Sequence, residues 1–121
     1  MVEPAFDGVI HELNRLRICS ALVNVDSLTF RSLREILATT DSALSKHVKL
    51  LVEHGYVAVM RVGNSGRYRR SIALTPRGRQ AYSDHMAALS KMIAFASLGD
   101  TSTVDRSLER FFEKEHHESS N

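Results

Sequence analysis

Residues 39–57 read TTDSALSKHVKLLVEHGYV, and this stretch combines an apolar stripe with a polar face. At about 100° per residue, Leu44, Val48 and Leu51 fall on one side of a helix, as core-facing residues do. The far side, between about 100° and 200° from Leu44, carries hydroxyl and ammonium groups: Ser42, Ser45, Lys46 and Lys49. Such groups donate hydrogen bonds to phosphate oxygens and to acceptors on base edges, so this face is a candidate for nucleic-acid contact.

The residues around this stretch define its helix and the helices before it. Thr39-Thr40-Asp41 supplies N-cap chemistry and Gly55 follows in the usual C-terminal position, which predicts a helix from Ser42 to His54. Helical apolar spacing within residues 30–37, including Ile36, follows turn and N-cap residues and predicts a short helix. Residues 9–23 predict an earlier helix with apolar residues, among them Leu13, on more than one side.

After Gly55 the pattern changes from helix to strand. Residues 56–62 are rich in β-branched and apolar side chains, Gly63-Asn64-Ser65-Gly66 is strong turn chemistry, and residues 67–74 alternate enough to form a return strand. Thr75-Pro76 then opens a long helix to about Ser97. The predicted fold is mainly α with a small β-hairpin, a winged helix-turn-helix with a long C-terminal helix.

The net charge of the chain is +2, but the charged residues are unevenly distributed along it. Residues 41–79 contain eight Lys or Arg against two Asp or Glu, whereas residues 96–121 contain three against six. The return strand begins with Arg67, Tyr68, Arg69 and Arg70, directly after the turn. Arginines at a hairpin tip pair with phosphates or enter a minor groove. A serine and lysine face is often only solvated surface, but its coincidence with this basic hairpin favours nucleic-acid contact.

The segments FRSLREIL, TTDSALSKHVKLLVEHGYV, GNSGRYRR and LTPRGRQAY together resemble small winged-helix transcriptional regulators related to the MarR and ArsR groups, in particular the stand-alone winged-helix DNA-binding domain family. The resemblance covers roughly residues 5–95. It implies a positioning helix over residues 30–38, a recognition helix over 42–54 and a wing over 59–72. It also implies a structural role for His47.

Length and composition favour one globular domain with an appended end. The 121 residues divide into an expected winged-helix domain over 1–97 and an acidic end over 98–121, where a short amphipathic helix is predicted around residues 104–112. No stretch approaches the roughly 18 uncharged apolar residues of a membrane span, and no secretory signal is recognisable. We therefore expect a cytoplasmic protein without a membrane partner.

Other site chemistry finds little support in the sequence. Six histidines raise the possibility of a metal site, but His11, His54 and His85 form no tight pair at helical spacing, and His116-His117 lies in the polar end. A lone cysteine, Cys19, is expected to pack in the core rather than to sense redox state. Phosphate-cradle and hydrolase motifs are absent, so we expect neither an enzyme nor a bound cofactor.

The long C-terminal helix carries an apolar seam with alternating spacings of four and three. Its members are Tyr82, Met86, Leu89, Ile93 and Ala96. Such a seam is typical of helix-helix contact and predicts a homodimer, whose two recognition helices would meet an inverted repeat about one DNA turn apart. Two alternatives stay open: a winged-helix module that docks a protein, and a DNA-binding regulator that responds to a ligand or metal.

Overall fold

The computed structural model describes residues 5–98 of the chain. The chain divides into two compact units, residues 1–87 and 88–121, and the division falls within the long C-terminal helix. The amphipathic helix predicted around residues 104–112 and the His116-His117 pair lie outside the described residues. The domain boundary expected near residue 97 stays a prediction.

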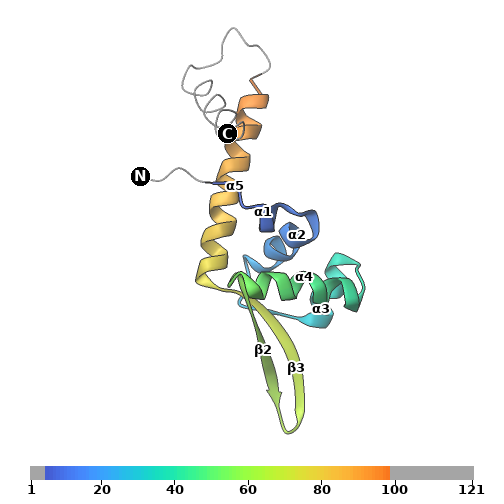
Figure 1. Ribbon diagram of the computed structural model, residues 1–121. Coiled ribbons are helices and arrows are strands. Elements are labelled where there is room, and N and C mark those ends of the chain that lie inside the picture. Colours follow the sequence, from blue (N-terminus) through green and yellow to red (C-terminus); the bar gives the residue numbers. More distant parts are fainter. Residues whose placement is uncertain (1–4, 99–121) are drawn as a thin grey trace. The chain divides into compact units, whose positions relative to one another are not determined.

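In the first unit, helices pack at the base of a small antiparallel sheet, and the hairpin of this sheet projects away from them (Figure 1). The order of helices and strands along the chain is α1 (Gly8–His11), α2 (Leu13–Leu22), β1 (Leu28–Thr29), α3 (Phe30–Leu37), α4 (Asp41–Glu53), β2 (Val57–Asn64), β3 (Arg67–Leu74) and α5 (Pro76–Ala96). The predicted mainly α architecture with a hairpin and a long C-terminal helix is confirmed. No helix within residues 5–98 is long and apolar enough to span a membrane.

The helix predicted over residues 9–23 is in fact two helices, α1 and α2. Glu12 breaks it with an extended backbone, at φ −61° and ψ 132°, and its carboxylate accepts a hydrogen bond from the Arg15 N–H at 3.0 Å. Glu12 thus acts as the N-cap of α2, a local hydrogen bond that competes with a continuous helix. The break also leaves Leu13 65% exposed, so its predicted place on an apolar side is wrong.

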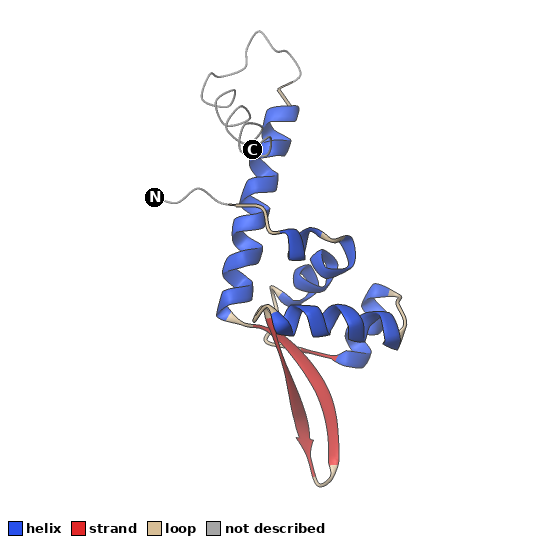
Figure 2. Cartoon of the chain, viewed as in Figure 1, coloured by secondary structure: helices blue, strands red, loops and turns tan. Residues whose placement is uncertain are grey.

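The sheet has a third strand that the sequence did not predict. Its order is β1-β3-β2, and β1 pairs with β3 through Leu28 opposite Ile72. Two residues are too few for an alternating pattern to be recognised. Figure 2 shows the β2-β3 hairpin extending away from the helices of the first unit. Its two-residue turn, Ser65-Gly66, has positive φ at both positions, as type I′ turns require.

The core of the first unit lies between α1–α4 and the base of the hairpin. It is formed by Ile10, Ile18, Cys19, Leu22, Phe30, Leu33, Leu37, Leu44, Val48, Leu51, Val57, Ile72 and Leu74. The stripe predicted along residues 44–51 is therefore confirmed. Ile36 differs from its predicted core position, since it is 56% exposed on α3.

The start of α5 fits closely against the turn that follows α4. Thr75 caps the helix by accepting the Gly78 N–H at 2.9 Å, and its hydroxyl donates to the Gly55 carbonyl at 2.6 Å. A Cβ on Gly78 would lie 2.0 Å from the Tyr56 carbonyl oxygen. The glycine of the LTPRGR segment is therefore required by a close backbone approach.

Candidate nucleic-acid interface

Helix α4 presents its polar face to solvent. Thr40 caps the helix by accepting the Ala43 N–H at 3.1 Å, so α4 begins at Asp41, one residue earlier than predicted. Four exposed residues form this face, and their side chains make no hydrogen bond or ion pair within residues 5–98: Ser42, Ser45, Lys46 and Lys49. Their donors are thus available to a partner, while the opposite side of α4 is fixed in the core.

His47 ties α4 to α2 at the border of the core stripe. The Arg15 guanidinium lies 3.2 Å from His47 Nδ1. The same nitrogen lies 3.7 Å from the Glu12 carboxylate, so the His47 ring is placed between the Arg15 guanidinium and the Glu12 carboxylate. Arg15 is itself held by its Nε, which donates to the Val9 carbonyl at 2.6 Å. His47 therefore positions the helix, in agreement with the structural role that the resemblance implies.

The hairpin separates its basic residues onto two faces. Cross-strand pairing sets Arg67 opposite Asn64 and Arg69 opposite Val62, whereas Tyr68 and Arg70 lie on the other face because side chains alternate along a strand. The Arg70 guanidinium stacks 4.1 Å from the centroid of the Phe30 ring. The four residues grouped by the sequence are therefore not one cluster, although all are exposed.

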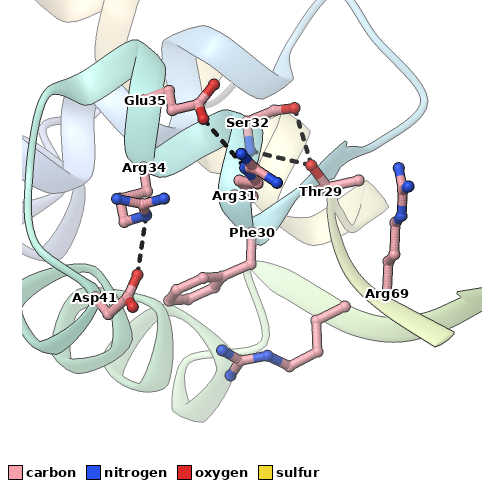
Figure 3. A pocket seen from close by; sticks show the side chains of 9 residues that line it. Thr29, Phe30, Arg31, Ser32, Arg34, Glu35, Asp41 and Arg69 are labelled. Atoms are coloured by element: carbon pink, nitrogen blue, oxygen red, sulfur yellow. Dashed lines mark hydrogen bonds and ion pairs between the residues drawn. The ribbon is translucent and has the colours of Figure 1, made fainter. Parts of the chain in front are cut away.

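A groove of about 760 Å³ lies between α3 and β3. We call it the arginine groove; it is lined by Thr29, Phe30, Arg31, Ser32, Arg34, Glu35, Asp41, Arg69 and Arg70. Figure 3 shows Arg34 directed at Asp41, with an Nε to Oδ1 distance of 3.0 Å, and Arg31 directed at Glu35 at 3.2 Å. Arg69 has no such acidic partner within residues 5–98. Four guanidinium groups against two carboxylates leave the groove positive.

Sequence reasoning missed the contribution of α3 to this surface. Arg31 and Arg34 precede the segment whose charge excess drew attention, and only the pairing of β1 with β3 places α3 beside the hairpin. A helical projection of residues 30–37 puts both arginines away from the side of Leu33, so helical periodicity could have predicted that they face away from the core.

Two arginines counted in the basic segment serve the fold instead. Arg79 donates from its two terminal nitrogens to the carbonyls of Val23 and Val25 at 2.7 and 3.2 Å. The Arg77 guanidinium lies 5.9 Å from the Tyr56 ring centroid, near the start of α5. The positive surface is accordingly smaller than the sequence count suggests, and it gathers around α4, the hairpin and the arginine groove.

Strand β2 also exposes apolar side chains. Val59, Met60 and Val62 are each at least 40% exposed, and β2 is an edge strand of the sheet. Exposed apolar residues on the wing are the feature expected of a protein-docking module. They stand beside the basic residues of the hairpin, so the wing carries features of both kinds.

The cysteine and the histidines occupy places that the sequence only partly predicted. Cys19 is fully buried in the core, as expected, and burial, together with the Asp7 charge, raises the pKa of its thiol to about 11. Within residues 5–98, no three His, Cys, Asp or Glu side chains gather as a metal site. The structure does bring together His11 and His85, whose ring nitrogens lie 3.1 Å apart.

The predicted dimer seam is not uniformly free. Tyr82 packs against the core of the first unit, and its hydroxyl lies 3.0 Å from the Ser20 hydroxyl. Met86 and Leu89 are half-buried, while Ile93 is 63% exposed. Tyr82 is therefore engaged within the first unit, and dimerisation through the seam stays a prediction.

Known proteins share this sequence pattern and this architecture. A family model described as a winged helix DNA-binding domain matches residues 14–93. An uncharacterized protein of Methanocaldococcus jannaschii is 30% identical over 78 residues, which cover 64% of this chain and 85% of that protein.

Two solved structures have the same fold. A transcriptional regulator homologue from Pyrococcus horikoshii OT3 matches with a TM-score of 0.68 at 22% identity, over 71% of this chain and 85% of that one. A MarR family transcriptional regulator from Silicibacter pomeroyi matches with a TM-score of 0.52 at 23% identity, over 87% of this chain and 66% of that one. The arrangement of helices, sheet and long C-terminal helix is thus shared with transcriptional regulators.

Proposed function

The chain belongs to the winged helix DNA-binding domain family, and from this premise we propose that it is a non-enzymatic, sequence-specific transcriptional regulator of double-stranded DNA. The observation that carries the proposal is the face of α4 formed by Ser42, Ser45, Lys46 and Lys49, whose donors are exposed beside the positive arginine groove. A regulator of chromosomal DNA acts in the compartment that holds it, so the cytoplasmic location expected from the sequence belongs to the proposal.

In this proposal α4 enters the major groove with its N-terminal half. Ser45 and Lys46 read base edges, since both point outward from the first two turns of the capped helix. Lys49 lies one turn later and reaches a phosphate. Ser42, next to the first free backbone N–H groups of α4, donates to another phosphate. The opposite side of α4 is held in the first unit by the contact of His47 with Arg15 and by the burial of Leu44 in the core.

In this proposal, the hairpin and the arginine groove bind the DNA backbone next to the segment that α4 contacts. Arg67 and Arg69 share one face of the hairpin and have no ion pair within residues 5–98, so both can neutralise phosphates or enter the minor groove. Arg31 of α3 is paired with Glu35 and therefore has only a supporting part. Arg70 and Arg34 have a supporting part, because each is already held, by Phe30 and Asp41 respectively.

We propose further that two copies bind an inverted repeat. The seam on α5 supplies the contact through the half-buried Met86 and Leu89 and the exposed Ile93. A two-fold dimer presents two α4 helices about one helical turn of DNA apart. Tyr82, predicted as a seam member, contributes mainly to the fold.

A selection from a pool of random duplexes tests this function. The full chain is incubated with the pool, and the bound fragments are recovered and sequenced over successive rounds. The proposal expects enrichment of an inverted repeat whose half-sites lie about ten base pairs apart. Binding without any enriched sequence would contradict sequence specificity, and recovery of no duplex at all would contradict the function itself.

The exposed apolar side chains of β2 favour one alternative, a winged-helix module that docks a protein. In that case Val59, Met60 and Val62 carry the interface. The variant Val62→Ser separates the two functions: it removes an apolar contact but leaves every basic residue in place. Under the main proposal, the variant and the parent chain bind DNA with equal affinity. If the chain is a docking module, neither of them binds DNA.

A further inference from the structure

A chain of hydrogen bonds joins the N-terminal segment to α5 inside the first unit. His85, on α5, is completely buried. Its Nδ1 lies 2.9 Å from the backbone nitrogen of Asp7, and its Nε2 lies 3.1 Å from Nδ1 of His11 on α1. The Phe6 ring packs edge-on against the same imidazole, with ring centroids 5.7 Å apart. None of these groups takes part in the proposed DNA contacts.

The partners of His85 determine where its proton resides. The backbone N–H of Asp7 can only donate, so Nδ1 of His85 must accept and carries no hydrogen. A neutral His85 therefore holds its proton on Nε2 and donates it to Nδ1 of His11, which must also be unprotonated. The geometry is satisfied only when both imidazoles are neutral. It also leaves Nε2 of His85 without a lone pair for a metal ion.

A proton on either ring destroys this arrangement. Added to Nδ1 of His85, it would point at the N–H of Asp7; added to Nδ1 of His11, it would point at the N–H of His85. In each case two donors face each other at hydrogen-bond distance, inside or at the edge of the core. His11 is exposed, so protons reach the pair from solvent.

Besides His11 of α1, the neighbouring titratable groups come from the segment before α1, from α2 and from the turn between α4 and β2. Asp7 accepts from the Tyr56 hydroxyl at 2.5 Å and from the N–H groups of Val9 and Ile10 at 2.9 and 3.0 Å. Cys19 of α2 remains a thiol. Burial and the neighbouring His11 lower the pKa of His85, and the Asp7 carboxylate opposes this only in part.

We propose that His85, His11 and the backbone N–H of Asp7 form a proton-operated latch, which holds residues 6–11 against α5 when both imidazoles are neutral and releases them when either is protonated. Residues 6–11 comprise the segment before α1 and α1 itself. The latch is independent of DNA binding.

The direction of the pH effect follows from the neutral state of buried His85. Its folded-state pKa lies below the ordinary value of 6.5, so the released or unfolded chain takes up a proton first as the pH falls. The stabilisation is complete above about pH 6.5 and is lost progressively below it, by up to tenfold in the closing equilibrium per pH unit for one proton. Burial raises the pKa of Asp7, but its hydrogen bonds lower it by more, so the pKa lies below 3.8. The stabilisation contributed by the Asp7 carboxylate is therefore lost only below about pH 3.8, in a more acidic range than that of His85.

Nitrogen NMR of the imidazole rings in the full chain tests the latch without any substitution. At pH 7.5 the expected spectrum has His85 protonated at Nε2 alone, with a coupling between that hydrogen and Nδ1 of His11. The backbone N–H of Asp7 should then be protected from exchange, and its protection relative to core amides such as that of Leu44 should fall at least tenfold by pH 5. A His85 ring protonated at Nδ1 would overturn the proposal.

The variant His85→Asn supplies the second test. Its side-chain oxygen replaces Nδ1 as acceptor for Asp7 but does not titrate. Unfolding curves between pH 7.5 and 5 should show a pH dependence smaller by about one proton than in the parent chain, whereas His54→Asn, a change of an exposed histidine at the end of α4, should retain the parent dependence. Equal pH dependence in His85→Asn and the parent chain would overturn the latch. If His85→Asn does not fold, the ring protonation in the parent chain decides.

Discussion

The arginines of this chain are of two kinds: some stabilise the fold through contacts with other residues, and others are available to bind a partner. Arg79 donates to the carbonyls of Val23 and Val25, and Arg34 pairs with Asp41. Arg67 and Arg69 have no ion pair within residues 5–98. Sequence alone could not separate the two groups, because the acceptors of Arg79 lie 56 and 54 positions earlier in the chain.

Replacing Lys46 with alanine should change which DNA sequences are bound. If Lys46 contacts a base edge, its loss relaxes the preference at one defined position by roughly 1 to 3 kcal/mol. Lys49→Ala is the matched comparison on the same helix face: as a phosphate contact it should weaken all sites nearly equally. The two outcomes are read from selections on randomised half-sites. Uniform weakening by Lys46→Ala would demote this lysine to a phosphate contact.

Replacing Arg79 with alanine should affect stability rather than DNA binding. The two carbonyls that it contacts lose a charged donor, which costs about 1 to 2 kcal/mol in a partly solvated setting. Chemical denaturation measures this loss in the free energy of unfolding. Arg77→Ala, which removes a neighbouring exposed guanidinium that lies only near the Tyr56 ring, should cost less. Equal stability of Arg79→Ala and the parent chain would show that the two hydrogen bonds contribute nothing.

At the scale of elements, the sequence predicted α3, α4, the hairpin and α5 within one or two residues. These elements carry local determinants: Thr40 and Thr75 at N-caps, and Ser65-Gly66 at the turn. The break between α1 and α2 and the strand β1 were not predicted. The break depends on the Glu12 carboxylate, which accepts a hydrogen bond from the backbone N–H of Arg15, and β1 exists only by pairing with β3.

The candidate site was predictable in its residues but not in its arrangement. The exposed face of α4 followed from helical periodicity, and its exposure is confirmed. The hairpin residues were grouped as one cluster, whereas the register of β2 with β3 separates Arg67 and Arg69 from Arg70. The arginine groove required the position of α3 beside β3, which no local pattern determines.

The junction between α4 and α5 gives a test at this scale. Gly78→Ala places a methyl group 2.0 Å from the Tyr56 carbonyl oxygen, so the start of α5 must shift, at a cost of about 2 to 4 kcal/mol. Gly8→Ala is the control, because a Cβ there has no neighbour within 4 Å. Thermal and chemical unfolding measure both variants. A stable Gly78→Ala chain with parental unfolding would mean that this backbone contact is looser than described.

At the scale of the whole molecule, the proposal that two copies assemble through the seam of α5 can be tested by one substitution. Ile93→Asp places a charge in the predicted contact between two copies, which costs several kcal/mol when the charge has no partner. The variant should sediment as a monomer and bind an inverted repeat poorly. Ser90→Asp, an exposed change on the same helix, should leave the dimer intact. A parent chain that is already monomeric at micromolar concentration would refute dimerisation through this seam.

Duplex-DNA affinity as a function of salt concentration is the most direct test of the central claim. If the chain binds DNA through its positive surface, the logarithm of affinity should fall linearly with the logarithm of salt concentration. Arg67→Ala and Arg69→Ala should each flatten that slope by roughly one unit, because each neutralised phosphate releases close to one counterion. Arg77→Ala should leave the slope unchanged. An affinity that does not depend on salt, or a slope equal in the parent chain and both hairpin variants, would contradict the account.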